Sequence, residues 1–331
     1  MKTVPVGQLI PCCTSCYRAD LQADALVFQR LPPLVQAIYD RAEAQRVRIQ
    51  CPSGVRIRFK SNTSCLSIAL RYGPAARSLF RGTLVVNGDL YPWGPDHQTP
   101  TWQDDIYRTE TRQDRLFDLW MPHLCRNDLF SFKINDDAEI LPAPTLPTRW
   151  LAFGDSITQG MTANLPTRTH TAIISLQRHY DCWNFGVGGA TFDAALATTI
   201  PHLPDAGMIT IAYGTNDFNR AIPITEMKHA LDRILAAIQQ RYPRIPAYLI
   251  TPVTWVDAPD ANAIGLSLDA YREAIGETGA TYPNITVIDG TKLIPDDSSC
   301  FVDKVHPNNR GFAIYADNLA PLLKAYRESP S

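Results

Sequence analysis

Trp150-Leu151-Ala152-Phe153-Gly154-Asp155-Ser156 decides the fold of the second half of the chain, because an apolar run passes directly into a Gly-Asp-Ser turn. Further apolar runs follow at 182–185, 208–212, 248–251 and 285–288, and helix-like segments lie between them. Alternation of strands and helices predicts a parallel sheet that is covered by helices on both faces. The helices are expected at 169–179, 194–200, 226–241, 268–278 and 311–327.

A different pattern fills residues 1–140. Polar and apolar side chains alternate at 46–49 and 55–60, and further short strand candidates lie at 66–70, 84–86, 116–120 and 130–134. Many short strands with alternating faces predict an antiparallel sandwich, with a helical turn or more within 33–44. The strand arginines have two interpretations, a ligand-binding face and the solvated side of a sheet, and strand alternation favours the second.

The two patterns meet at Leu141-Pro142-Ala143-Pro144-Thr145-Leu146-Pro147-Thr148. Proline lacks an N–H donor and fixes φ, so this segment cannot continue a helix or a central strand. It is typical of a short, stiff linker. We therefore predict a sandwich domain at 1–140, a linker at 141–148 and an α/β domain at 149–331.

The composition argues against several kinds of partner. The chain has 331 residues, of which 45% are apolar and 19% charged, and its formal net charge is −2 without a run of like charges. Neither nucleic acid nor a membrane is expected as a partner. The segment Met1–Gln8 lacks the apolar core of a signal peptide, and no run approaches the roughly 18 apolar residues that span a bilayer. We expect a cytoplasmic protein.

The eight cysteines agree with that expectation. Most stand alone in apolar surroundings, as buried thiols do in a reducing compartment. Cys13 and Cys16 have the spacing of half a zinc site or of a redox pair, but no second pair follows them. Ordinary thiols are therefore favoured, no metal is expected, and the sequence assigns no role to Cys12, Cys13 or Cys16.

Four polar segments are candidates for a site, because ligands of parallel sheets bind at the carboxyl ends of the strands. Three of them, Phe153–Gly160, Asn184–Thr191 and Tyr213–Asp217, lie at the ends of predicted strands, and Asp303–Asn308 precedes the last predicted helix. Each also has an ordinary interpretation, as a helix cap, a tight turn, an Asn turn or a structural histidine.

Two other kinds of site fit these segments less well. A phosphate-binding loop is disfavoured because the glycine segment matches neither GxGxxG nor GxxxxGK[ST]. A metal-dependent phosphoesterase needs clustered Asp and His ligands at several strand ends. Only Asp155, Asp217 and Asp303 are available for that purpose.

Taken in order, the four segments resemble the GDS, glycine, GxND and DxxHP blocks of the SGNH/GDSL hydrolases, over residues 149–328. The resemblance implies a flavodoxin-like three-layer domain and acyl chemistry without a cofactor. It implies that Ser156 is the nucleophile, that His306 is its general base and that Asp303 orients His306. A serine hydroxyl is a poor nucleophile until such a base removes its proton. The absence of GxSxG argues against the α/β-hydrolase form of the same chemistry.

The same resemblance implies an oxyanion hole. Its donors are the N–H of Ser156, the N–H of Gly189 and the side-chain amide of Asn216, and Gly189 is preferred to Gly188 by the alignment of the glycine block alone. Asp155 and Asp217 are expected to support the loops rather than to act chemically.

The sandwich-first layout resembles the two-domain subset of this family, in which a jelly-roll-like domain similar to carbohydrate-binding modules precedes the hydrolase domain. This implies hydrolysis of short-chain acyl esters, on an acylated sugar or another small polyol, through an acyl-serine intermediate. The close alternative is an O-acyltransferase, which shares every catalytic residue. A non-catalytic carbohydrate-binding protein is the remote alternative, because the full residue set argues against a degenerate site.

Several properties stay open at this level. Trp255 could line an acyl pocket or belong to ordinary loop packing. Acyl chain length, the alcohol portion of the substrate and the oligomeric state are not readable, and the sandwich could serve homo-oligomer formation instead of sugar binding.

Overall fold

The computed structural model of the chain describes residues 1–326. Its second half contains the expected parallel sheet, in the order β14 (Tyr180–Gly186), β13 (Thr148–Gly154), β15 (Met208–Ala212), β16 (Ala247–Ile250) and β17 (Ile285–Ile288). Every neighbouring pair in it is parallel. This is the 2-1-3-4-5 order of flavodoxin-like sheets, which confirms the predicted fold class. The order reverses beside β13, so the strand that leads to Ser156 lies at the switch point.

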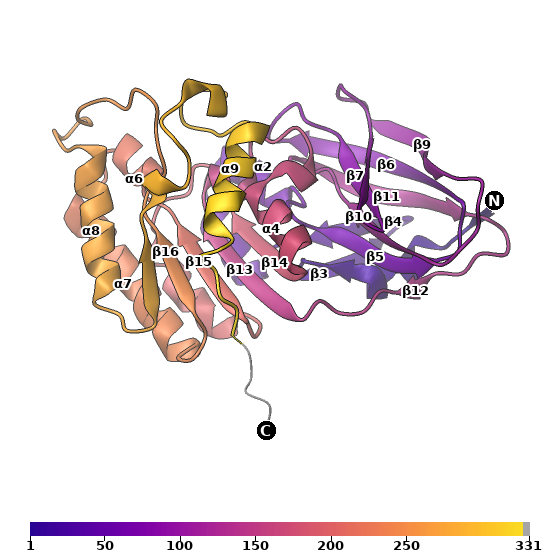
Figure 1. The fold of residues 1–331 in the computed structure, drawn as a ribbon, viewed down its shortest axis with the longest axis horizontal. Coiled ribbons are helices and arrows are strands. Elements are labelled where there is room, and N and C mark those ends of the chain that lie inside the picture. The colour runs from indigo at the N-terminus through magenta and orange to yellow at the C-terminus, as the bar shows by residue number, and fades with distance from the viewer. Residues whose placement is uncertain (327–331) are drawn as a thin grey trace. The chain divides into compact units, whose positions relative to one another are not determined.

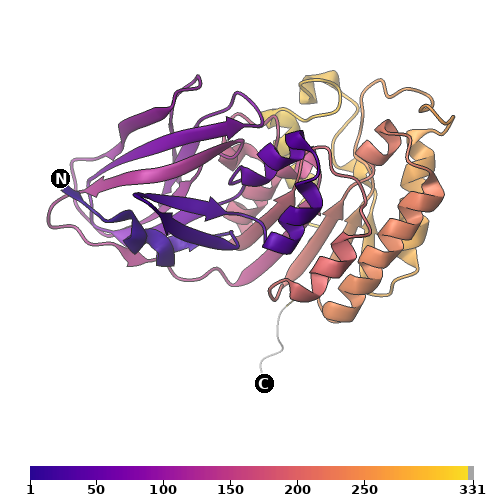
Figure 2. The same ribbon diagram turned by 180° about the vertical axis from the view of Figure 1, so that it is seen from behind.

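Helices cover both faces of this sheet, as Figures 1 and 2 show from opposite sides. On one face, α4 (His170–Arg178) and α9 (Asn309–Leu319) share a core with Trp150, Met208 and Tyr248. The other face carries α5 (Leu196–Thr199), α7 (Ile224–Arg241) and α8 (Leu268–Ala280). Buried residues of α7 recur at helical spacing, so its apolar stripe meets the sheet.

The first half forms the predicted sandwich of two antiparallel sheets. One sheet has the order β3-β4-β11-β6-β9, with β1 beside β11, and the other has the order β12-β5-β10-β7-β8, with β2 beside β5. Phe59 of one sheet meets Phe132 of the other edge to face, with ring centroids 5.6 Å apart. The strands are β1 (Lys2–Thr3), β2 (Cys13–Thr14), β3 (Arg18–Gln22), β4 (Ala25–Gln29), β5 (Arg56–Ser61), β6 (Cys65–Ala75), β7 (Gly82–Val86), β8 (Asp89–Trp93), β9 (Thr101–Arg108), β10 (Arg115–Trp120), β11 (Cys125–Ile134) and β12 (Leu141–Pro142).

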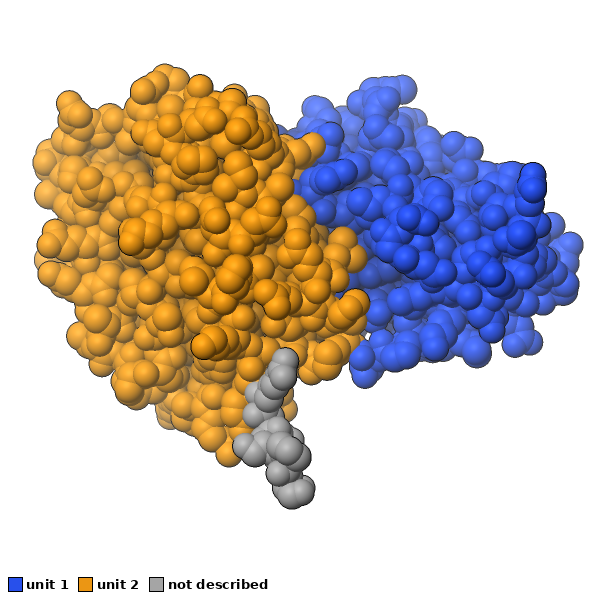
Figure 3. All heavy atoms as spheres, viewed as in Figure 1, with its two compact units in different colours: residues 1–31, 46–145, 164–168 blue, residues 32–45, 146–163, 169–331 orange. Residues whose placement is uncertain are grey.

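The chain divides into two compact units that are discontinuous in sequence (Figure 3). The first comprises residues 1–31, 46–145 and 164–168, and the second comprises 32–45, 146–163 and 169–331. Helix α1 (Pro33–Tyr39) therefore belongs with the parallel sheet, although it lies early in the chain. In that unit the Tyr39 hydroxyl lies 3.4 Å from the hydroxyl of Tyr213, which directly follows β15.

The segment expected as a linker is partly structured. Leu141 and Pro142 pair with β5, the N–H of Ala143 donates to the Arg58 carbonyl at 3.2 Å, and β13 begins at Thr148. Pro142 is accommodated because β12 is an edge strand.

Three expectations about local structure are wrong. Residues 46–49 belong to helix α2 (Glu43–Gln50) instead of a strand, because four alternating residues are too few to outweigh a run of good helix formers. Helix α9 ends at Leu319, two residues before Pro321, and Arg327 lies outside the described residues. Arg56 and Arg58 do not lie on a solvated sheet face, since they are only 2% and 9% exposed.

The buried arginines form a charged cluster with Asp118 on β10. Arg56 Nη1 lies 3.0 Å and Arg58 Nε 3.5 Å from Asp118 Oδ2. The Arg56 guanidinium also stacks over the ring of Trp120, 4.5 Å from its centroid. Burial raises the pKa of the Asp118 carboxyl, whereas the two arginines favour its charged form.

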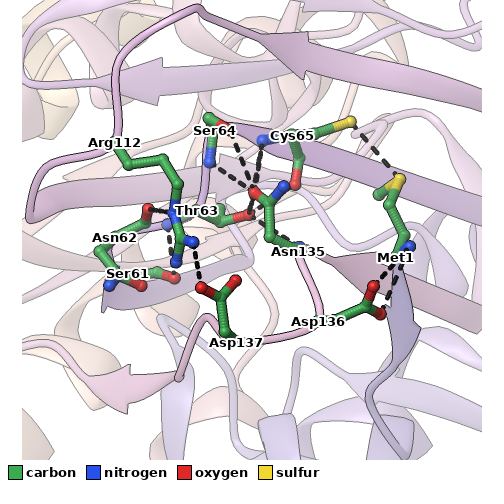
Figure 4. Close-up of polar contacts among 10 residues, drawn as sticks. All are labelled: Met1, Ser61, Asn62, Thr63, Ser64, Cys65, Arg112, Asn135, Asp136 and Asp137. Atoms are coloured by element: carbon green, nitrogen blue, oxygen red, sulfur yellow. Dashed lines mark hydrogen bonds and ion pairs between the residues drawn. The ribbon is translucent and has the colours of Figure 1, made fainter.

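A second polar cluster organises the loop between β5 and β6 (Figure 4). Asn135 Oδ1 accepts from the backbone N–H groups of Ser64 and Cys65, at 2.7 and 3.2 Å, and from the Thr63 hydroxyl at 2.8 Å. Arg112 pairs with Asp137 beside it. One Asn thus satisfies backbone donors that the turn leaves without strand partners.

Two further findings concern the described residues. No helix within 1–326 is both long and apolar enough to cross a bilayer. All eight cysteines are free thiols.

Candidate active site

Ser156 is the first residue of α3 (Ser156–Gln159), a single helical turn at the end of β13. The side chain of Asp155 caps this turn, because its Oδ1 accepts the N–H of Ile157 at 2.9 Å. The turn lies close to β14, where a Cβ on Gly186 would come within 2.4 Å of the Gln159 nitrogen. Asn184 joins the two elements by donating to the Thr158 carbonyl at 2.7 Å.

His306 approaches Ser156 from the loop before α9. Its Nε2 lies 2.8 Å from Ser156 Oγ, and its Nδ1 lies 2.9 Å from both carboxylate oxygens of Asp303. The tautomer with its proton on Nδ1 satisfies both contacts, and it leaves Nε2 free to accept the serine proton. Residues 150 positions apart in sequence thus form one hydrogen-bonded chain.

The short turn that carries Asp303 explains how it reaches the imidazole. Asp303 Oδ1 also accepts the backbone N–H of His306 at 2.8 Å, so the carboxylate is fixed to the residue that it orients. Partial burial raises the pKa of Asp303, but the hydrogen bonds from the His306 backbone and ring outweigh it and hold the pKa below its ordinary value. The Asp303 carboxylate is therefore ionised at neutral pH.

The glycine segment presents two N–H groups with different surroundings. The N–H of Gly188 donates to Gln159 Oε1 at 2.8 Å. The N–H of Gly189 has no acceptor within residues 1–326, and the φ of +75° at this residue is readily accessible to glycine. Of the two, Gly189 is thus the residue whose N–H is available to a ligand.

Asn216 lies at the start of α6 (Thr215–Asn219), directly after β15. Its side-chain amide donates to Asp155 Oδ2 at 3.2 Å and to the Ala190 carbonyl at 3.0 Å. These contacts bring the amide to the same edge of the sheet as Ser156 and the glycine segment. To donate to a ligand, the amide must release one of its two acceptors.

The two supporting aspartates are buried carboxyl groups. Burial raises the pKa of Asp155 to about 6, although the Ile157 N–H and the charge of His306 oppose the shift. Burial likewise raises the pKa of Asp217 to about 7, against the hydrogen bond from the Phe192 N–H. Their hydrogen bonds join neighbouring loop segments, and the supporting role predicted for both residues stays a prediction.

Three neighbours of the site were not identified from the sequence. Gln159 Oε1 accepts the N–H of Gly188, and Arg220 donates to the Gly189 carbonyl at 2.6 Å. The hydroxyl of Tyr39 in α1 lies within hydrogen-bond distance of the Tyr213 hydroxyl. Gln159 and Arg220 lie three and four residues beyond Ser156 and Asn216, at the spacing of one helical turn, which is a signal that a search of the motif neighbourhoods could have used.

Trp255 lies near two of the site's elements. Its ring meets Phe218 of α6 edge to face at 5.7 Å, and the next residue, Val256, donates its N–H to the Lys304 carbonyl in the His306 loop at 2.9 Å. Within residues 1–326, no group of three or more Cys, His, Asp or Glu side chains is arranged to hold a metal ion.

A serine, a histidine and an aspartate hydrogen-bonded in this order, at the switch point of a flavodoxin-like sheet, have the arrangement of a Ser-His-Asp triad. Residues 152–314 match the GDSL-like Lipase/Acylhydrolase family, so the chain carries a domain of that family and is an enzyme of its class. This confirms the family resemblance that the four sequence blocks indicate.

Solved structures extend the likeness to nearly the whole chain. A salicylyl-acyltransferase from a tetracycline biosynthetic pathway, SsfX3, is 20% identical with a TM-score of 0.79, over 94% of each chain. A protein described as a GDSL-like lipase from Bacteroides ovatus is 17% identical with a TM-score of 0.77, over 97% of this chain and 96% of that one. A family two carbohydrate esterase from Clostridium thermocellum, solved with cellohexaose, is 16% identical with a TM-score of 0.63, over 82% and 91%. At these identities the likeness concerns the fold. A search of curated protein sequences finds no match.

Proposed function

We propose that the protein is a serine esterase that hydrolyses short-chain acyl esters through an acyl-Ser156 intermediate. The observation that carries the proposal is the hydrogen-bonded chain from Ser156 Oγ through His306 Nε2 and Nδ1 to Asp303, with distances of 2.8 and 2.9 Å. Such a chain activates a hydroxyl that is otherwise a poor nucleophile.

In the first half of the proposed reaction, Ser156 Oγ attacks the ester carbonyl carbon while His306 Nε2 takes the hydroxyl proton. The carbonyl oxygen becomes an oxyanion, which accepts hydrogen bonds from the N–H of Ser156, the N–H of Gly189 and the amide of Asn216. Collapse of the intermediate breaks the bond to the alcohol oxygen. The alcohol leaves with the proton from Nε2, and the acyl group stays on Oγ.

The second half repeats these steps with water. His306 takes a proton from a water molecule as it attacks the acyl carbon, and then returns the proton to Ser156 Oγ. The carboxylic acid leaves and the enzyme is restored. Asp303 stabilises the imidazolium in both halves without taking the proton itself.

We further propose an acylated sugar or another small polyol as the substrate. The support is the sandwich that precedes the hydrolase domain, a layout shared over most of both chains with the carbohydrate esterase solved with cellohexaose. The proposed order along the chain stays a sandwich domain at 1–140, a linker at 141–148 and a catalytic domain at 149–331, except that residues 32–45 group with the parallel sheet and residues 164–168 with the sandwich.

Acyl transfer to an alcohol is the second candidate. Similarity to SsfX3 over 94% of both chains favours it, and an alcohol can intercept acyl-Ser156 in place of water by the same steps. Ser156 is only 8% exposed, and transfer is favoured over hydrolysis where a closed site keeps water from the acyl-enzyme.

The first experiment compares p-nitrophenyl acetate hydrolysis by the wild type, Ser156→Ala and Ser175→Ala at equal folded concentration. Ser175 is a matched control because it is also buried and its hydroxyl has no partner within the described residues. We expect burst kinetics and turnover in the wild type and in Ser175→Ala, and neither in Ser156→Ala. Equal turnover by all three proteins would refute the nucleophile assignment.

A panel of acyl donors and acceptor alcohols then separates the two candidates. Hydrolysis that is insensitive to added alcohol supports the esterase. A product ester that forms in proportion to one acceptor, at the expense of free acid, supports the transferase.

The proposal also includes a reducing compartment. Eight free thiols, seven of them buried, support it. Fractionation of cells that express the native chain tests this point.

A further inference from the structure

The loop that carries Gly189 is a short turn with two successive glycines. Ala190 N–H donates to the Val187 carbonyl at 2.9 Å, which closes a turn around Gly188 and Gly189. Two successive glycines have no side chains with which to fix the turn by packing. An oxyanion donor must nevertheless be held within a few tenths of an ångström of its acceptor position. Contacts from outside the loop must therefore fix it.

Helix α6 supplies most of these contacts. Asn216 donates to the Ala190 carbonyl at 3.0 Å, and Asp217 accepts the Phe192 N–H at 3.2 Å. Arg220, which follows the last turn of α6, donates from Nη2 to the Gly189 carbonyl at 2.6 Å. Two side chains of α6 and that of the next residue, Arg220, thus hold three backbone groups of the loop. Only the Arg220 contact holds the glycine itself from this side.

The Arg220 contact becomes more important during the reaction. The Asn216 amide is already shared between Asp155 and Ala190, so donation to an oxyanion withdraws one of those bonds. If the bond to Ala190 is withdrawn, Arg220 becomes the remaining tie between α6 and the residue pair Gly189–Ala190. A hydrogen bond from a guanidinium is stronger than one from a neutral donor, so it can hold the Gly189 carbonyl without the Asn216 bond.

We propose that Arg220 is a positioning residue for the oxyanion hole, which holds the Gly189 N–H in place by binding the carbonyl of the same residue. The inference rests on the proposed function, because it requires an oxyanion at Ser156. Arg220 does not need to touch the substrate for this role, although its side chain is exposed.

The kinetic test compares Arg220→Ala, Arg220→Lys and Arg241→Ala with the wild type. Arg241 is a matched control, because its guanidinium also donates to a backbone carbonyl, that of Leu203 at 3.3 Å, at the far end of α7. We expect Arg220→Ala to lower kcat by about tenfold to a hundredfold, with KM changed less than about threefold. This loss is no larger than the loss caused by deleting an oxyanion donor itself, because the Gly189 N–H is displaced and not removed. Arg220→Lys should recover part of the loss, and Arg241→Ala should match the wild type.

A spectroscopic test observes Gly189 directly. Gly188-Gly189 is the only Gly-Gly pair in the sequence, so labelling glycine with carbonyl-¹³C and ¹⁵N leaves a single cross-peak, that of the Gly189 amide, in an HNCO spectrum. A short-chain alkyl trifluoromethyl ketone serves as the probe. Ser156 Oγ adds to its carbonyl carbon, His306 takes the proton, and a stable oxyanion results. In the wild type the Gly189 peak should move downfield when this adduct forms, and in Arg220→Ala that movement should fall by more than half.

Each result of the kinetic and NMR tests leads to a different conclusion. A full downfield movement in Arg220→Ala, or an unchanged kcat, overturns the role of Arg220. A loss of kcat with a full downfield movement means that Arg220 acts on the substrate instead, which also overturns it. An adduct that leaves the wild-type Gly189 peak in place overturns the inference but keeps Ser156 as the nucleophile. Failure of the ketone to add to Ser156 at all contradicts the proposed function.

Discussion

Asp155 Oδ2 accepts the side-chain amide of Asn216 at 3.2 Å, so the residue before Ser156, the proposed nucleophile, positions an amide that comes from the end of another strand. The other carboxylate oxygen accepts the Ile157 N–H and caps the helical turn that begins with Ser156. One buried carboxylate thus connects the turn that begins with Ser156 to the Asn216 amide, the proposed oxyanion donor. Asp155 has no direct contact with Ser156 Oγ, so its influence on catalysis is through position.

Asp155→Asn tests this connection without removing the cap. Asn is as good an N-cap as Asp, but one end of its amide presents N–H groups to the N–H groups of Asn216. We expect kcat to fall by roughly tenfold to a hundredfold, since the Asn216 amide is displaced from a site where one donor is worth at most about 4 kcal/mol. Asp289→Asn is the control, because Asp289 also accepts a backbone N–H, that of Thr291 at 3.0 Å, beyond edge strand β17. Equal kcat values for Asp155→Asn and Asp289→Asn would mean that the contact between Asp155 and Asn216 does not affect catalysis.

Asp303→Asn should cause a much larger loss with little change in stability. The Asn amide turned toward Nδ1 favours the imidazole tautomer with its proton on Nε2, which then faces Ser156 with a donor and cannot take its proton. We expect kcat to fall by about a thousandfold to ten-thousandfold, measured under saturating p-nitrophenyl acetate.

The control for Asp303 comes from a neighbouring loop. Asp257 pairs with Lys304 at 2.9 Å, and both side chains are more than half exposed. Surface ion pairs contribute little, so Asp257→Asn should stay within about threefold of the wild type. A comparable loss in both variants would point to disturbance of the loop instead of the tautomer.

The candidate site could be predicted because its chemistry lies in short blocks at strand ends. Ser156 directly follows a strand whose apolar run is plain in the sequence, and Asp303 reaches His306 within one turn. A parallel sheet brings such blocks to one edge, so their order along the chain is enough to place them together.

The parts that could not be predicted depend on contacts between distant segments. Nothing local in Pro33–Tyr39 indicates that Tyr39 meets Tyr213, and the alternation around Arg56 does not reveal that Asp118 neutralises it in a buried position. The strand predicted at residues 46–49 is wrong for a different reason. Alternation of polar and apolar side chains over four residues does not distinguish a strand from a helix with a single buried side chain, here Ile49.

Removal of Asp118 should strongly destabilise the sandwich. Arg56 is 2% exposed, and without Asp118 its guanidinium stays buried with no opposite charge beside it. We expect Asp118→Ala to lower the free energy of unfolding by about 3–5 kcal/mol, measured by urea titration of tryptophan fluorescence. Asp24→Ala breaks the exposed pair with Arg71, 3.4 Å, and should cost less than about 1 kcal/mol. Similar costs for the two variants would mean that the buried cluster contributes no more than a surface pair.

Asp217 should make the protein less stable as the pH rises toward neutrality. Its pKa is about 7 in the folded chain against an ordinary value of 3.8, so between these values the folded state holds a proton that the unfolded state has released. The contribution of this group to the free energy of unfolding is therefore fully present below about pH 4. It is lost as the pH rises through 7, at up to about 1.4 kcal/mol per pH unit. Asp217→Asn removes this dependence, and its oxygen can still accept the Phe192 N–H. Unfolding free energies measured from pH 4 to pH 8 should flatten in the variant, apart from the slope up to about pH 6 that belongs to Asp155. Parallel curves for the two proteins would mean that the pKa of Asp217 is the same in the folded and unfolded chain.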